Sequence, residues 1–154
     1  MLFAVTLAAI FLSIALGVSQ IAYKESIFGT SAKDTNNAFF AADAGEECAL
    51  YYDRSDQNVF TPTGSSSISS CAGSSNIPVT PGPTNVWTFV VPGLGSTGTG
   101  CASVTVDKTG TNILCASSPT CIFSKGYNTG SGGVGSGTCN PPANAVEREL
   151  DTNY

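Results

Sequence analysis

The first 23 residues of the chain, MLFAVTLAAIFLSIALGVSQIAY, contain no charged side chain. As a helix rising about 1.5 Å per residue, this segment would extend over roughly 34 Å, which is enough to cross the hydrocarbon core of a bilayer. Its clearly polar side chains are few, namely Thr6, Ser13, Ser19 and Gln20. The segment therefore fits a secretory signal, a membrane anchor, or the apolar part of a longer helix.

The residues next to the apolar segment separate these interpretations. A cleavable signal should begin with Lys or Arg and end at a small-residue site followed by a break. The basic start is missing here, and Gly17-Val18-Ser19 is only a weak cleavage site. A simple anchor should be followed by a flexible linker, but no proline occurs before Pro62 and the helical pattern continues. We therefore expect one helix over residues 1–53, on the order of 80 Å long.

The second half of this expected helix, residues 24–53, has one face of small residues. Positions at steps of three and four carry Ala38, Ala41, Gly45, Cys48 and Tyr52, with Ala42 and Ala49 beside them. This spacing predicts an amphipathic helix whose small-residue face packs under another element. Glycine inside a helix costs up to about 1 kcal/mol relative to alanine, so Gly29 and Gly45 either weaken the helix or permit close packing.

Charge and composition exclude several function classes. The net charge is −5 and the chain has only six basic residues, so the clustered Lys and Arg of a direct nucleic-acid binder are missing. The sequence contains no histidine, which rules out Ser-His-Asp, Cys-His and His-liganded metal chemistry. Between residues 55 and 146 only four side chains are charged. With 42% hydrophobic residues the chain is too apolar to be disordered.

Six cysteines lie in a region rich in Gly, Ser, Thr and Pro, namely Cys48, Cys71, Cys101, Cys115, Cys121 and Cys139. An even number at such spacings favours disulfides formed outside the cytosol. A metal site is less favoured because the closest pair, Cys115 and Cys121, has five residues between its members instead of two. Six cysteines allow 15 pairings, and the sequence does not choose between them.

Residues 54–154 are expected to form a small β head in an α+β fold with the helix. Short β-like runs occur at Val86–Val91, Ala102–Val106, Thr111–Cys115, Cys121–Lys125 and Ala145–Thr152, which predicts four or five antiparallel strands. Pro92-Gly93 should stop the first run. Along the last run, Glu147, Glu149 and Asp151 share a face that we expect to be solvated. Gly64–Ser75 and Gly126–Gly137 are expected surface loops, and three disulfides would stabilise so small a core.

Two chemical motifs need an explanation. Gly93–Gly98 matches G-x-G-x-x-G, but a dinucleotide loop also requires a helix opening at the third glycine, so a glycine-rich hairpin is the better interpretation. Asp43, Glu46 and Glu47 lie on the expected helix and have the spacing of an acid pair or a divalent-ion site, yet a solvated helix face explains them better. Tyr51-Tyr52 indicates a buried helix end. We expect no catalytic site, no cofactor and no metal.

The uninterrupted run from apolar segment to amphipathic helix, followed by a small disulfide-linked head, resembles the type IV pilins and pseudopilins. The segment AKDTNNAFFAADAG, residues 32–45, is similar to the corresponding helix of minor pilins. The resemblance implies a lollipop pilin fold in which the apolar half of the helix sits in the inner membrane before assembly and in the filament core afterwards. Its polymerisation residues would be Met1, Leu2, Phe3, Val5, Leu7, Ile10, Phe11, Ile14, Leu16, Gly17, Val18 and Ile21.

The resemblance also implies partners and a location. The chain would form a homo-oligomeric helical filament at the cell surface, with a precursor pool in the inner membrane and the pilus assembly machinery as a partner. Met1 is expected at or near the mature first residue. Val5 stands where the family usually carries a glutamate, and Ala22 where it carries a proline. The missing glutamate favours a minor pilin or pseudopilin, and a membrane-anchored extracellular binding protein is the alternative from another class.

Overall fold

A computed structural model of the protein describes residues 2–55, 57, 59–62, 67–112, 118–130 and 138–154. The described residues form one long helix and a six-stranded antiparallel sheet, which confirms the predicted α+β class. The elements in chain order are α1 (Leu2–Arg54), β1 (Ser67–Cys71), β2 (Ser74–Pro81), β3 (Val86–Leu94), β4 (Gly100–Asp107), β5 (Cys121–Tyr127) and β6 (Glu147–Asn153).

Contacts within the chain define two compact units, Met1–Lys33 and Asp34–Tyr154, and α1 contributes residues to both. The first unit is helix alone. The second unit contains the rest of α1 and the whole sheet. The division at residues 23 and 53 expected from the sequence follows hydropathy rather than contacts, and it stays a prediction.

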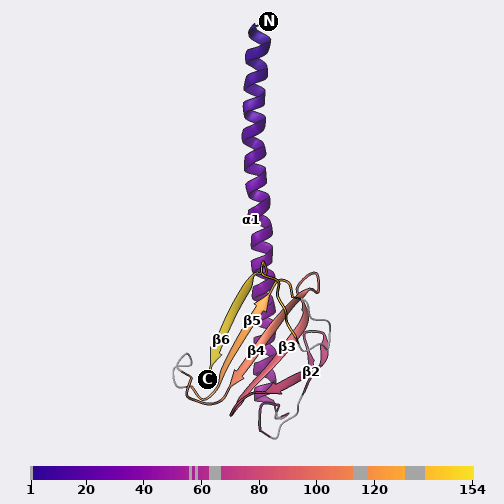
Figure 1. The fold of residues 1–154 in the computed structure, drawn as a ribbon, viewed down its shortest axis with the longest axis vertical. Helices are drawn as coiled ribbons and strands as arrows, with labels where there is room; N and C mark the ends of the chain where they lie inside the picture. Colours follow the sequence, from indigo (N-terminus) through magenta and orange to yellow (C-terminus); the bar gives the residue numbers. More distant parts are fainter. Residues whose placement is uncertain (1, 56, 58, 63–66, 113–117, 131–137) are drawn as a thin grey trace. The chain divides into compact units, whose positions relative to one another are not determined.

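The sheet is a simple meander, with strand order β1-β2-β3-β4-β5-β6 and every neighbouring pair antiparallel. Alternate residues of the central strands point into the core, as the two-residue period of a strand requires. The buried positions of these strands include Phe89, Val91, Val104, Val106 and Ile122. In Figure 1 the strands of the head lie alongside the last turns of α1, so that this part of the helix covers one face of the sheet.

The small-residue face of α1 is the surface that packs on the sheet, as the sequence predicted. Ala38, Ala41, Ala42, Ala49 and Tyr52 are each at most 3% exposed. The backbones of α1 and β5 approach closely here because the side chains between them are small or absent. A Cβ added at Gly126 of β5 would collide with the backbone of α1 at residues 38 and 42.

Gly45 has the same role from the helix side. A Cβ at this position would lie 2.6 Å from Ser124 Oγ and 2.8 Å from Val104 Cγ2, which leaves no room for alanine. Gly45 therefore permits close packing. A Cβ at Gly29, by contrast, would meet no atom within 4 Å. Of the two explanations that the sequence left open for these glycines, close packing applies at Gly45 only.

The prediction of a surface loop over Gly64–Ser75 is wrong for the residues that the structure describes. Ser67–Cys71 and the residues from Ser74 onward form the hairpin β1–β2. Residues 64–66 lie outside the described residues. Serine-rich strands lack the β-branched signal, and this hairpin has just one apolar cross-strand pair, Ile68 opposite Ile77. Its turn places Ala72 at φ 46° and Gly73 at φ 85°, the left-handed conformations of a tight hairpin. These two strands form because of their pairing and the geometry of the turn, and not because of their amino-acid composition.

The expected stop at Pro92-Gly93 is also wrong. Strand β3 continues to Leu94 across an irregularity in register between Pro92 and Leu94, where Gly93 has a φ of 76°. A bulge accommodates a proline that an ordinary ladder position would reject. Over the described residues the sheet has six strands instead of the expected four or five, because the hairpin β1–β2 was not expected.

The remaining sequence boundaries differ at the ends of elements. Thr111 and Asn112 of the expected strand Thr111–Cys115 are not in a strand, and residues 113–115 lie outside the described residues. Gly126 and Tyr127, expected in a loop, belong to β5, whereas 131–137 lie outside the description. Strand β6 begins at Glu147, after the expected start at Ala145.

Candidate assembly surface

The N-terminal unit exposes large apolar side chains along its whole length. Their exposed fractions run from 39% at Leu7 to 77% at Phe3. Successive residues of a helix are about 100° apart, so these side chains project on every side and do not form a single stripe. The exposed set is Phe3, Val5, Leu7, Ile10, Phe11, Leu12, Ile14, Leu16, Val18, Ile21, Tyr23, Ile27 and Phe28.

Most residues predicted for polymerisation lie in this exposed set. Gly17 is also open, since a Cβ there would meet no atom within 4 Å. Met1 and the side chain of Leu2 lie outside the described residues. The role assigned to these residues stays a prediction, but their exposure leaves them available for contact with lipid or with another chain.

Hydroxyl side chains in the apolar part of this unit hydrogen-bond to carbonyl groups of their own helix. Thr6 Oγ1 donates to the Phe3 carbonyl at 2.9 Å, and Ser13 Oγ donates to the Ile10 carbonyl at 2.8 Å. Hydroxyls bonded in this way need no partner from water. Within the described residues, α1 is long and apolar enough to cross a membrane, by length and composition alone. An exposed apolar surface of this size marks a site of membrane or protein contact.

Disulfides cross-link the head. Cys48–Cys71 joins α1 to β1, and Cys101–Cys139 joins β4 to the segment before β6, each with Cα atoms 5.9 Å apart. Cys121 is disulfide-bonded as well. The described residues contain no free cysteine, so the disulfide prediction is confirmed for these five; Cys115 lies outside the described residues.

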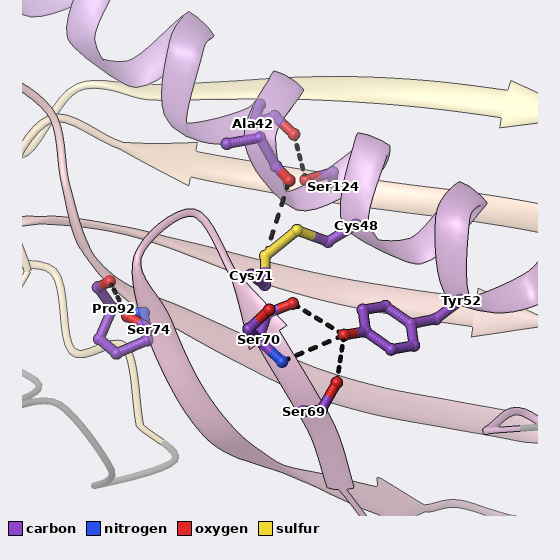
Figure 2. The surroundings of a disulfide bond; sticks show 10 residues. Ala42, Cys48, Tyr52, Ser69, Ser70, Cys71, Ser74, Pro92 and Ser124 are labelled. Carbon is purple, nitrogen blue, oxygen red and sulfur yellow. Dashed lines mark hydrogen bonds between the residues drawn. A yellow bond between two sulfur atoms is a disulfide. The ribbon is translucent and has the colours of Figure 1, made fainter. Parts of the chain in front are cut away.

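A buried tyrosine reinforces the first cross-link (Figure 2). The hydroxyl of Tyr52 lies 2.7 Å from Ser69 Oγ, contacts the Ser70 carbonyl at 2.9 Å and accepts the Ser70 amide at 3.1 Å. Burial raises the pKa of Tyr52, but these hydrogen bonds outweigh it and lower the pKa below the ordinary value. The predicted buried helix end is therefore right for Tyr52, whereas Tyr51 is 62% exposed.

A second polar cluster closes the end of α1. The Asp53 side chain, only 6% exposed, forms an ion pair with Lys108 and accepts the Tyr154 hydroxyl at 2.6 Å. The Arg54 guanidinium lies 4.5 Å from the centre of the Tyr154 ring. Burial and the bond to Asp53 raise the pKa of Tyr154. The sequence does not indicate this cluster, because Asp53 and Tyr154 are 101 residues apart and no motif links the members.

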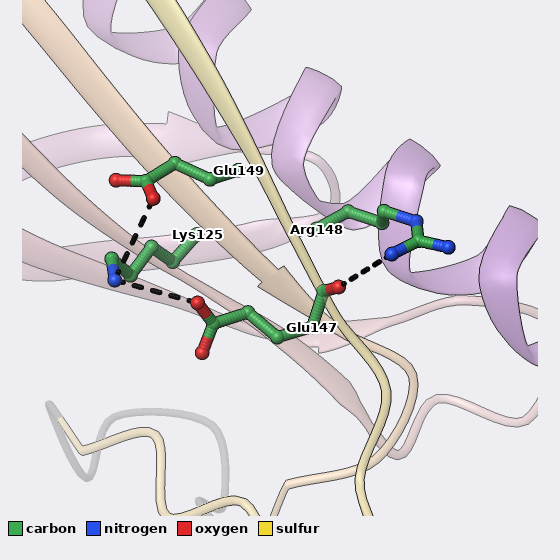
Figure 3. A network of polar contacts seen from close by, with 4 residues as sticks. All are labelled: Lys125, Glu147, Arg148 and Glu149. Carbon is green, nitrogen blue, oxygen red and sulfur yellow. Dashed lines mark hydrogen bonds and ion pairs between the residues drawn. The ribbon is translucent and has the colours of Figure 1, made fainter.

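The edge strand β6 presents the charged face that the sequence predicted. Glu147, Glu149 and Asp151 are exposed. Figure 3 shows Lys125 Nζ between Glu147 Oε1, at 3.4 Å, and Glu149 Oε2, at 3.7 Å. The hydrogen bond to Glu147 and the two carboxylate charges raise the pKa of Lys125. Exposed ion pairs of this kind contribute about 1 kcal/mol or less, so they keep the edge soluble more than they stabilise it.

The motifs with a possible chemical role have structural explanations. Gly93–Gly98 spans the end of β3 and the hairpin into antiparallel β4, as expected, and no helix opens there. Of the three helix carboxylates, Glu46 accepts a hydrogen bond from Thr152 Oγ1, and Glu47 is exposed. Among the described residues, no group of three or more Asp, Glu, Cys or His side chains is placed to hold a metal ion.

No family model, curated protein or solved structure matched this chain when it was compared with each. The functional argument therefore depends on the exposed apolar helix and the cross-linked head. These features are compatible with a pilin-like fold.

Proposed function

We propose that this protein is a structural subunit of the type IV pilin class, which polymerises through its N-terminal helix into an extracellular filament for adhesion, motility or DNA uptake. The observation that carries the proposal is the helix of the first unit, whose large apolar side chains from Phe3 to Ile21 are exposed. A helix that is apolar all round needs a surrounding of lipid or of other helices.

The energetics favour assembly over isolation in water. Burial of apolar surface contributes about 25 cal/mol per Å², so each helix face packed against a neighbour is worth several kcal/mol before the costs of association. A contact between different surfaces of identical chains repeats without closing, which produces an open helical polymer. Such a subunit needs no active site, so we propose a non-enzymatic role, in keeping with the absence of histidine from the sequence.

The head supports a location outside the cytosol. Disulfides persist in oxidising compartments and are rare in cytosolic proteins. Before assembly the same apolar helix would hold the subunit in the inner membrane, where the pilus assembly machinery would take it up. With a net charge of −5 and six basic residues, we expect no direct contact with nucleic acid.

Two alternatives each have an observation in their favour. Val5 replaces the glutamate usual in the family, which favours a minor pilin or a pseudopilin of a secretion system. A helix long and apolar enough to cross a membrane also suits a membrane-anchored extracellular binding protein. A binding protein of that kind would be a monomer in detergent, whereas a pilin would form filaments in material sheared from the cell surface.

The test is electron microscopy of sheared surface material from cells that produce the protein. Deleting residues 1–23 should abolish filaments and release a soluble monomer. Ile14→Asp should also abolish them, because a carboxylate would then lie in an apolar interface. Ser31→Asp is the matched control, since Ser31 is an exposed polar position on the same helix.

Filaments that persist in the deletion variant or in Ile14→Asp would refute polymerisation through this helix. Immunogold labelling of the native assembly then separates the two pilin alternatives. Labelling along the shaft indicates a major subunit, and labelling at the tip alone indicates a minor one.

A further inference from the structure

A groove of about 360 Å³ lies at the turn end of the β2–β3 hairpin, beside the segment that follows α1. Pockets of roughly this size hold small-molecule ligands. Its walls include Val59, Pro62, Pro81, Thr84, Asn85 and Trp87, and none of its described lining residues is charged. Neither the helix nor the disulfides of the filament proposal use this groove.

The floor of the groove consists of buried side chains. Trp87 is 6% exposed, and its ring centroid lies 6.4 Å from that of Phe60, which stacks on Phe89 at 5.9 Å. Val59, next to Phe60, is 2% exposed. The floor therefore belongs to the hydrophobic core of the head.

The rim is a strained turn. Thr84 has a φ of 22° and Asn85 a φ of 62°, and a β-branched residue at positive φ is a genuine outlier. Two backbone hydrogen bonds hold this conformation, from the Gly82 amide to the Val86 carbonyl at 2.7 Å and from the Lys108 amide to the Asn85 carbonyl at 2.8 Å. Strain held in place by its surroundings is typical of binding sites.

We propose that this groove binds a neutral saccharide. The apolar walls suit the C–H faces of a sugar ring, and the Asn85 amide and the Thr84 hydroxyl, at the rim, can donate to and accept from its hydroxyl groups. A charged ligand would lose its hydration without gaining a counter-charge from the described lining residues, none of which is charged. The proposal is independent of the filament: a monomeric head would bind the sugar equally well.

Trp87 allows a site-specific test, because it is the single tryptophan of the chain. The full chain in phosphocholine micelles, which contain no sugar headgroup, is titrated with glucose, galactose, N-acetylglucosamine, lactose and cellobiose while tryptophan fluorescence is recorded. Sialyllactose and a proline decapeptide are titrated in parallel. We expect a saturable change with at least one neutral sugar, and weaker binding of sialyllactose than of lactose.

The decisive variant is Asn85→Gly, which removes the amide while tolerating the left-handed backbone. It should weaken sugar binding roughly tenfold, the effect of losing one or two hydrogen bonds. Asn76→Gly is the matched control, because Asn76 is exposed, has a φ of 53° and does not line the groove. Asn85→Asp, which keeps the side-chain shape and suits the same turn, should also weaken binding.

Failure of every neutral sugar to give a saturable signal would overturn the proposal. So would equal affinity in native protein and Asn85→Gly, or binding confined to sialyllactose or to the proline peptide. None of these results bears on whether the protein forms filaments.

Discussion

At the scale of single residues, the contact between helix and sheet depends on side chains that are small or missing. Ser124 is fully buried, and its hydroxyl donates to the Ala42 carbonyl at 2.6 Å, so its polar group is satisfied inside the interface. Gly126, two residues further along β5, lies directly against the backbone of α1 at Ala38 and Ala42. Backbone atoms cannot rotate out of the way as a flexible side chain can.

We therefore expect Gly126→Ala to destabilise the head by about 3 kcal/mol, because the added methyl group overpacks the interface. The measurement is urea unfolding of the full chain in micelles, followed by circular dichroism. Gly29→Ala is the control and should leave stability unchanged or raise it by up to about 1 kcal/mol, since the position is open and helical. Equal stability of the native chain and Gly126→Ala would contradict the packing described for this glycine.

Tyr127 makes the free energy of unfolding of the head depend on pH in the alkaline range. Burial and a hydrogen bond to Glu147 raise its pKa from 10.0 to about 12 in the folded chain. The stabilisation is fully present below pH 10 and is lost as pH rises through 12, because the unfolded chain ionises first. In Tyr127→Phe the midpoint of unfolding should fall less steeply with pH across that range. In Tyr51→Phe, at an exposed site, the midpoint should fall as steeply as in the native chain. An unchanged dependence of the midpoint on pH in Tyr127→Phe would refute the assignment to Tyr127.

At the scale of elements, α1 has two kinds of environment along its length. From Asp34 onward it belongs to the head, where alanines and a glycine form the buried face. Before that point its side chains are exposed, although they are the more hydrophobic ones. Hydrophobicity alone would have assigned burial the other way round, and the exposure of this part of α1 is the observation on which the proposed assembly depends.

The β1–β2 hairpin depends on its link to α1. Its strands are rich in serine, and Cys48–Cys71 with the Tyr52 hydroxyl attach it to the helix. Cross-linking residues 23 apart stabilises a fold by about 3 kcal/mol, mainly by restricting the unfolded chain.

Cys48→Ser combined with Cys71→Ser should therefore lower the free energy of unfolding by about that amount and speed hydrogen exchange of the Ile68 and Ser70 amides. Exchange measured by mass spectrometry or NMR checks this. The double variant of Cys101 and Cys139 is the control, because its bond joins β4 to the chain before β6 and should leave exchange in β1 unchanged. Unaltered exchange in the first variant would show that the hairpin holds without its cross-link.

At the scale of the whole molecule, the composition differs between the N-terminal half of α1 and the head. The hydrophobic excess of the sequence is concentrated in the first half of α1, where the large apolar side chains are exposed, while the head has a small core and cross-links. Assembly would bury the apolar half of the helix. The head would separately bind a neutral saccharide in the groove at Trp87. The filament test and the sugar titration address these two proposals separately.

The sequence by itself determined the helix, its apolar first half and its small-residue face, because side chains at steps of three and four act through local geometry. It also determined the oxidised head, and strands such as Val86–Val91 that carry a β-branched or aromatic pattern. The tertiary structure alone decided the hairpin β1–β2, the passage of β3 through Pro92, the pairing of Cys48 with Cys71 and the groove at Trp87. These features depend on contacts between distant residues, and no local pattern in a single sequence records such contacts.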